Sequence, residues 1–196
     1  KDKTFEVGVR YSESKNKYPV TILCNEENQG YGGNQKLGYS YAIKNNFDIV
    51  VLLHGDGQYA PECIPTLIEP LLDNSADAVF GSRMLTKGAA RRGGMPLYKF
   101  VGNKILTTIQ NILLKTNFSE FHSGYRVYRV AALSQIPFQY NSNNFHFDTE
   151  IIIQLLAAHF TMKEVPIPTY YGDEICRVDG IKYAKNVIMT TLLSRF

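Results

Sequence analysis

Hydrophobic residues along this chain fall into two patterns, short unbroken runs and longer runs with helical spacing. The unbroken runs at residues 19–24, 50–53 and 77–80 predict strands buried on both faces of a sheet. Positions spaced by three and four residues predict helices, and residues 97–114 form the longest of them. This alternation predicts an α/β fold with a mostly parallel sheet flanked by helices.

Weaker patterns predict the remaining elements. Helices are expected at 4–11, 34–43, 61–72, 145–156 and 181–196, a glycine-rich turn at 25–33, a short strand at 127–128 and an edge strand at 161–167. The last helix is amphipathic, and it can pack on the domain or lie on an anionic membrane surface. We therefore expect a main domain over 1–178 and an amphipathic helix over 179–196.

Polar side chains follow two of the predicted strands. Asp56 and Gln58 come after the strand at 50–53, and Arg83 follows the strand at 77–80. Parallel strands carry such residues to the same edge of the sheet, where α/β proteins bind ligands. The oxygen atoms of Asp56 and Gln58 suit a divalent metal, and the positive charge of Arg83 suits the diphosphate that such a metal carries. A surface turn at Asp56 and a surface ion pair at Arg83 are the alternatives.

Three further segments carry candidate chemistry. Residues 84–96 form a basic, glycine-containing stretch that is either a lid over an anionic ligand or a solvated connection. His122 lies in a polar turn, where it is expected to fix the turn, and Arg126 at its end is the stronger functional candidate. Asp148 and Glu150 lie at a helix start, a position that suits carboxylates without any chemistry.

Composition excludes several classes of protein. The chain has 196 residues, 44% hydrophobic and 20% charged, which is typical of one globular domain with or without an appendage. A net charge of +3 gives no support for nucleic-acid binding. The three dispersed cysteines favour neither a disulfide framework nor a zinc site and fit a cytoplasmic location. The sequence contains no apolar run of 18 residues, so membrane contact is expected only at the cytosolic surface.

Taken together in chain order, the motifs resemble the family 2 inverting glycosyltransferases, in the branch of dolichyl- and polyprenyl-phosphate sugar synthases. The resemblance covers nearly the whole chain. It rests on NQGYGGNQKLGYSYAI at 28–43, LHGDGQYAPE at 53–62, GSR at 81–83, HSGYRVY at 122–128, FDTE at 147–150 and EVPIPTYY at 164–171. It implies a GT-A-like, Rossmann-like fold and a catalytic centre with Asp56 and Arg83.

The resemblance also implies the ligands of the site. Asp56 matches the second acid of a D-x-D motif that binds Mg²⁺ or Mn²⁺, Gln58 completes the metal site, and His54 stands where the first acid is expected. Contacts to a UDP- or GDP-linked sugar are implied for Asn28, Gly30, Gln35, His54 and Asp56. Contacts to a lipid phosphate are implied for Arg83, Arg91, Lys99, Asn103 and Arg126, with Lys99 and Asn103 matched by spacing.

The first residues resemble the tail of a D-D-G-S-x-D-x-T motif, which implies that one or two strands precede residue 1. The expected reaction is inverting transfer of a sugar to a polyprenyl or dolichyl phosphate, which needs no general base. Transfer to a saccharide hydroxyl in cell-wall or surface glycan synthesis would need one of Asp148, Glu150 and Glu120. A non-catalytic nucleotide- or lipid-binding domain is a further alternative, and a nucleotidyltransferase would need a phosphate-gripping loop that the sequence lacks.

Overall fold

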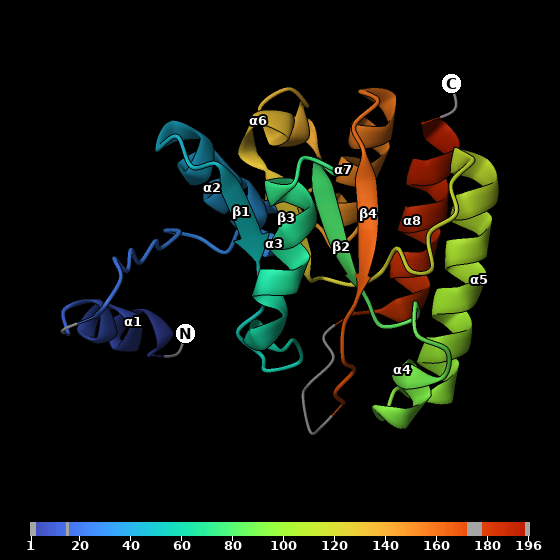
Figure 1. Ribbon diagram of the computed structural model, residues 1–196, viewed down its shortest axis with the longest axis horizontal. Helices are drawn as coiled ribbons and strands as arrows, with labels where there is room; N and C mark the ends of the chain where they lie inside the picture. The colour runs from blue at the N-terminus through green and yellow to red at the C-terminus, as the bar shows by residue number, and fades with distance from the viewer. Residues whose placement is uncertain (1–2, 15, 172–177, 195–196) are drawn as a thin grey trace.

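A computed structural model describes residues 3–14, 16–171 and 178–194, and its centre is a four-stranded sheet (Figure 1). The strands are β1 (Ile49–Leu52), β2 (Ala78–Ser82), β3 (Arg126–Arg129) and β4 (Met162–Pro166), in the order β1-β3-β2-β4. Strand β3 runs antiparallel to both β1 and β2, and β2 pairs in parallel with β4. Strands β1, β2 and β4 therefore run in one direction, and their carboxyl ends share one edge.

Helices cover both faces of this sheet. The α-helices are α1 (Thr4–Ser12), α2 (Gly30–Lys44), α3 (Ile64–Leu72), α4 (Ala89–Arg92), α5 (Leu97–Leu114), α6 (Val130–Leu133), α7 (Phe147–Ala157) and α8 (Gly180–Leu193), with 3₁₀ turns at Pro61–Cys63 and Phe138–Tyr140. Helix α3 covers one face, and α2, α6 and α7 cover the other. Helices α5 and α8 lie side by side beyond β4 (Figure 1).

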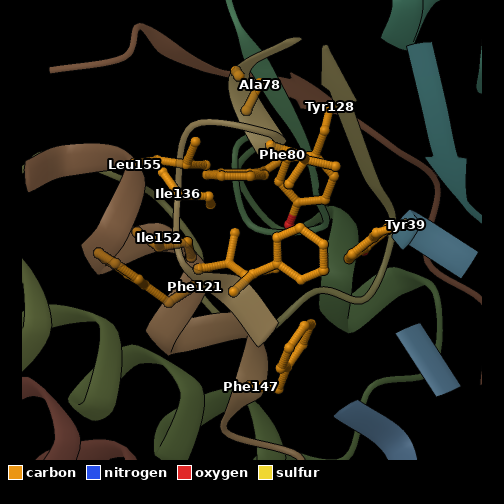
Figure 2. Packing of buried hydrophobic residues seen from close by; sticks show 13 residues of the cluster. Tyr39, Ala78, Phe80, Phe121, Tyr128, Ile136, Phe147, Ile152 and Leu155 are labelled. Atoms are coloured by element: carbon orange, nitrogen blue, oxygen red, sulfur yellow. The ribbon is translucent and has the colours of Figure 1, made fainter. Parts of the chain in front are cut away.

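The core divides into two layers because side chains of β2 and β3 alternate between the faces of the sheet. Phe80 and Tyr128 point toward α2 and α7, where they meet Tyr39, Phe121 and other apolar side chains (Figure 2). On the opposite face, Val79 packs against the apolar side of α3. Strand β2 is buried throughout, which explains its unbroken apolar run.

The α/β fold class is confirmed, and the helix predicted at 97–114 is found with the same bounds. The strand predicted at 19–24 is wrong, since this stretch has no regular secondary structure. A β-branched run forms a strand only beside a partner, and β1 pairs with β3 alone among the described strands. Strands β1 and β2 end at one edge, as expected, and β3 lies between them in the sheet.

Helix α2 begins inside the predicted glycine-rich turn. The Asn28 side chain accepts the N–H of Gly30 at 2.8 Å, and this contact lies at the start of the helix. Gly32 is packed so closely that a Cβ there would lie 2.8 Å from Cβ of Phe147. These glycines therefore serve the close approach of α2 to the start of α7.

Helix α8 packs against α5 and α7, with Val187 and Thr191 buried. Its start is capped by Asp179, whose carboxylate accepts the N–H groups of Ile181 and Lys182 at 3.1 Å each. The division of the chain at residue 178 stays a prediction. None of the described helices has the length and apolar character needed to cross a membrane.

Candidate active site

The loop after β1 carries an exposed acid beside a histidine. The side chain of Asp56 is 43% exposed, and the N–H of Gln58 donates to its Oδ1 at 3.0 Å, which orients the carboxylate. Its Oδ2 lies 3.9 Å from Nδ1 of His54, whose side chain is 25% exposed. The carboxylate is therefore held in place at the sheet edge where ligands of α/β folds bind.

The ring of His54 is enclosed by three neighbours. It meets the rings of Tyr31 and Tyr59 edge to face, with centroids 5.7 and 5.3 Å away. Gly124 lies so close that a Cβ there would be 2.8 Å from Nε2 of His54. Burial lowers the pKa of His54 despite the opposing Asp56 carboxylate, so the imidazole is neutral at pH 7.

A buried network connects His54 to the interior. The hydroxyl of Tyr31 donates to Oδ2 of Asp148 at 2.9 Å and lies 3.3 Å from Nε2 of His54. Gln35 donates to Oδ1 of Asp148 at 3.1 Å, and Nε of Arg126 lies 3.6 Å from Oδ2. Burial, followed by the Asp148 carboxylate, raises the pKa of Tyr31, which therefore keeps its proton.

Two residues of this network, Arg126 and Gln35, were predicted to contact ligands. Arg126 is 1% exposed, lies over the ring of Phe80 and donates to the carbonyl of Phe121. Gln35 is 4% exposed. Both side chains hold Asp148, and direct contacts of Arg126 with an acceptor and of Gln35 with a donor stay predictions.

Arg83 forms a second buried cluster at the end of β2. Its guanidinium pairs with the fully buried Glu120, which also accepts from Asn103 at 2.7 Å. The Arg83 Nη1 donates to the hydroxyl of Tyr171 at 3.1 Å. Although burial opposes it, the Arg83 charge lowers the pKa of Glu120, so the pair is ionic.

The basic segment after β2 borders a cavity of about 220 Å³. It is lined by Arg83, Met84, Thr86, Lys87, Gly88, Ala90, Phe100 and Lys104. Nearby, Lys99 lies over the ring of Tyr171 at 5.0 Å, and Arg91 donates to the carbonyl of Met95. The predicted loop 84–96 thus contains a helical turn, α4, with Ala90 and Met95 buried, and it presents cations beside Arg83.

His122 fixes its loop, in line with the sequence interpretation. Its Nδ1 lies 2.8 Å from the hydroxyl of Tyr183 on α8, and its backbone carbonyl accepts from Arg83 at 3.2 Å. The other ring nitrogen, Nε2, is buried without a hydrogen-bond partner among the described residues. Burial lowers the pKa of His122 to about 4.

The predicted metal ligands can be tested against this geometry. Within the described residues, no group of three or more His, Cys, Asp or Glu side chains is placed to hold a metal ion. Asp56 and Gln58 nevertheless suit a cation that takes its other ligands from a diphosphate and water, as Mg²⁺ commonly does. Asn28 and Gly30, predicted to bind the donor, lie at the start of α2.

Sequence reasoning missed Tyr31, Tyr59, Gly124 and Tyr171. Each of them lies inside one of the motifs given above, and this position was the one feature of the sequence that could have indicated a role in the site. Their contacts to His54 and Arg83 depend on loops that are far apart in the sequence. No local pattern reports such contacts.

A mixed sheet that collects an acid, a histidine and an arginine at the carboxyl ends of its strands is the arrangement of a GT-A-like α/β protein. Residues 1–136 match the family model described as Glycosyl transferase family 2, and the chain belongs to this family. It is 32% identical over 154 residues to a UDP-N-acetylglucosamine–dolichyl-phosphate N-acetylglucosaminyltransferase of Methanococcus voltae, covering 79% of this chain and 61% of the relative. It is 26% identical over 149 residues to a polyprenol monophosphomannose synthase of Mycolicibacterium smegmatis, covering 76% and 55%.

Solved structures agree on the fold. Glucosyl-3-phosphoglycerate synthase from Mycobacterium tuberculosis, in complex with phosphoglyceric acid, matches with a TM-score of 0.61 at 16% identity, over 88% of this chain and 56% of that one. The same enzyme with Mn²⁺, UDP-glucose and glycerol 3-phosphate matches with a TM-score of 0.53 at 17% identity, over 91% and 56%. The chain spans 55–66% of the length of the first three curated relatives.

Proposed function

We propose that this protein transfers a sugar from a UDP- or GDP-linked donor to a polyprenyl or dolichyl phosphate, with inversion at the anomeric carbon. The observation that carries the proposal is that Asp56 and Arg83 follow β1 and β2, which run in the same direction and end at one edge. A metal-bound donor diphosphate needs a carboxylate that holds the metal, and an anionic acceptor needs a positive charge. Both groups must lie at the same edge for the two substrates to react. The names of the relatives support this acceptor class.

On the donor side, Asp56 is the residue proposed to hold the metal, with Gln58 beside it. A bound Mg²⁺ or Mn²⁺ would offset the negative charge that develops on the leaving diphosphate. The chain contributes an oriented carboxylate, because the N–H of Gln58 fixes Oδ1. Fold neighbours crystallised with Mn²⁺ support the choice of ion.

On the acceptor side, the cavity beside Arg83 is proposed to receive the phosphate. Lys87 and Lys104 line it together with Arg83, and Lys99 lies close to Tyr171. Because Arg83 is paired with Glu120, its side chain has a fixed position in the wall of the cavity. Its Nη1 group, which donates to Tyr171, adds positive charge there. A phosphate positioned by these cations attacks as an anion.

The candidate bases already form ion pairs or hydrogen bonds within the protein, which favours a phosphate acceptor over a hydroxyl acceptor. Glu120 is fully buried and paired with Arg83. Asp148 is 7% exposed and contacts Tyr31, Gln35 and Arg126. Glu150 accepts the N–H of Ser142 at 2.8 Å. Since a hydroxyl nucleophile needs a base within reach, these contacts favour an acceptor that needs none.

With a lipid acceptor, the proposed location is the cytosolic face of a membrane, and α5 offers a surface for that contact. Its outer side exposes an apolar stripe formed by Leu97, Tyr98, Val101, Ile105 and Ile112. Lys104 borders the stripe, as expected of a helix that lies at an anionic lipid surface. Val101→Asp with Ile105→Asp should reduce co-sedimentation with anionic vesicles, whereas unchanged co-sedimentation would remove this surface from the proposal.

The reaction is tested by a transfer assay with UDP- and GDP-sugars and detergent-dispersed polyprenyl phosphate, with and without EDTA. Asp56→Ala should lower turnover by about a hundredfold or more, the scale expected for loss of charge stabilisation at the leaving group. Asp48→Ala is the matched control, because Asp48 is an exposed acid just before β1, at its other end. Full turnover by Asp56→Ala would overturn the role of Asp56.

The same assay separates the alternatives. Transfer to a saccharide hydroxyl but not to polyprenyl phosphate would overturn the acceptor assignment. Metal-dependent donor binding without turnover on either acceptor would favour the non-catalytic binding domain.

A further inference from the structure

The residue that departs from the family motif, His54, has a defined orientation. We infer that His54 is a second protein ligand of the metal through Nδ1, so that an imidazole and the Asp56 carboxylate form the protein part of the site. This inference rests on the proposed metal-dependent donor site and deepens it. It assigns a function to the position at which a carboxylate was expected.

The hydrogen bonds of Tyr31 determine which nitrogen of His54 carries the proton. Tyr31 has one hydroxyl hydrogen, and it is donated to Oδ2 of Asp148 at 2.9 Å. Its oxygen therefore acts as the acceptor toward Nε2 of His54, 3.3 Å away, and Nε2 is the protonated nitrogen. The Nδ1 atom is left with a free lone pair.

This arrangement matches a general feature of metal-binding histidines. The nitrogen that does not bind the metal donates its hydrogen to a neighbouring acceptor, which fixes the tautomer and the ring. Here that acceptor is a tyrosine hydroxyl backed by Asp148, and Asp148 is held in turn by Gln35 and Arg126. Four side chains, which come from α2, β3 and α7, thus fix the orientation of the His54 ring.

The Nδ1 atom that carries this lone pair lies near the carboxylate of Asp56. Nδ1 of His54 lies 3.9 Å from Oδ2 of Asp56, which is too long for a hydrogen bond. With metal–ligand bonds of about 2.1 Å, two ligand atoms on one ion lie roughly 3 to 4 Å apart. The observed separation lies within this range, so one cation can bind both atoms, and two acceptor atoms this close gain from a cation between them.

The ring is also preorganised for this role. Gly124 and Tyr59 enclose it, while a quarter of the side chain stays open to solvent. A ligand held in this way needs no rearrangement when the ion arrives. Because a nitrogen ligand raises affinity along the series from Mn²⁺ to Co²⁺ more than it does for Mg²⁺, the site should prefer Mn²⁺ and Co²⁺ to Mg²⁺.

The test uses Mn²⁺ with UDP, and with GDP in parallel, as the probe. Electron spin-echo envelope modulation of the bound Mn²⁺ should show coupling to an imidazole ¹⁴N. His54→Asp should abolish this coupling while Mn²⁺ stays bound, and should lower the Mn²⁺-over-Mg²⁺ preference at least about fivefold. His159→Asn is the matched control, since His159 is an exposed histidine at a positive φ that asparagine tolerates.

Tyr31→Phe provides a second variant, because it removes the acceptor of Nε2 and leaves His54 in place. It should weaken Mn²⁺ binding by about tenfold or more and keep the ¹⁴N coupling. Tyr41→Phe, in the same helix with an exposed hydroxyl bond to Thr21, should change neither.

The outcomes separate the inference from the function on which it rests. Bound Mn²⁺ without nitrogen coupling, or coupling that persists in His54→Asp, overturns the ligand role and leaves the donor site standing. If neither nucleotide leads to Mn²⁺ binding, the proposed metal-dependent donor site is overturned, and the inference with it.

Discussion

The imidazole of His54 lies against the α-carbon of Gly124, so closely that a methyl group there would be 2.8 Å from Nε2. The N–H of Gly124 donates to the hydroxyl of Tyr59 at 2.8 Å, and the ring of Tyr59 meets that of His54. The loop after β1 and the loop before β3 are thus held in contact by this hydrogen bond and by the packing of the two rings. The glycine of the HSGYR segment is needed for this close approach, not for a turn with positive φ.

Gly124→Ala should damage the site more than the fold. The added methyl group displaces the His54 ring, so turnover and Mn²⁺-dependent donor binding should fall by about a hundredfold, as small misplacements at active sites do. The free energy of unfolding should change by no more than about 1–3 kcal/mol, because a side chain can move aside. Turnover and urea denaturation measure the two effects.

Gly38→Ala is the control for that substitution. Gly38 is an exposed position within α2, and a Cβ there would meet nothing within 4 Å. Alanine should stabilise the protein by about 0.5–1 kcal/mol and leave turnover unchanged. Equal loss of turnover in both variants would contradict the contact between Gly124 and His54 as the cause.

Glu120→Gln should destabilise the fold by about 3–5 kcal/mol. The substitution leaves the guanidinium of Arg83 buried without its counter-charge, and an uncompensated buried charge is expensive. Thermal or urea unfolding gives the value. Asp77→Asn is the matched control, because the Asp77–Arg129 pair is about 30% exposed at 3.8 Å and should cost under about 1 kcal/mol. Similar losses in the two variants would argue against a buried ion pair at Arg83.

Stability should depend on pH through His122. Burial lowers its pKa to about 4 in the folded protein, against 6.5 for a free histidine, so the unfolded chain binds more protons between these values. The stabilisation is complete above pH 6.5 and is lost as pH falls toward 4, by up to about 3 kcal/mol. The charged groups around the ring are Glu120, Arg126 and Arg83, and the Tyr183 hydroxyl contacts Nδ1.

His122→Gln isolates this contribution from that of other groups, including His54. Urea unfolding at several pH values should show a smaller decrease between pH 6.5 and 4 in His122→Gln than in the unmodified protein. His159→Asn, at an exposed position, should leave the slope unchanged. Parallel curves for all three proteins would mean that the pKa of His122 is the same in the folded and unfolded states.

The sequence predicted those parts of the structure that depend on local patterns. Helix α5 repeats its apolar spacing over five turns, and β2 is apolar because it is buried on both faces, so both were found. Residues 19–24 have the composition of a strand, but pairing is a non-local property, and none of the described strands pairs with this stretch. The insertion of β3 between β1 and β2 was missed for the same reason.

The candidate site was predictable to a similar extent. Asp56 and Arg83 follow strands, so their position at the sheet edge could be inferred from periodicity alone. The buried partners could not, because Glu120 and Asp148 meet Arg83 and Tyr31 across 37 and 117 residues of chain. Arg126 was expected at the end of a polar turn, whereas it begins β3, is buried and lies over Phe80.

Removal of positive charge from the cavity beside Arg83 should weaken acceptor binding without affecting chemistry. In Lys87→Gln with Lys104→Gln, the two lysines that line the cavity become neutral at nearly constant size. The KM for polyprenyl phosphate should rise about five- to tenfold with kcat nearly unchanged, because these cations attract the phosphate equally in the ground and transition states. The salt dependence of KM should also become weaker, since fewer charges are screened.

Lys44→Gln with Lys163→Gln removes the same charge at exposed positions, at the end of α2 and on β4. That double variant should keep the original KM, which distinguishes a local effect from one of net charge. A fall in kcat with constant KM in the cavity variant would place the lysines at the reacting groups. An unchanged KM would show that the acceptor phosphate binds elsewhere, because cations that touch or face a bound anion contribute to its affinity.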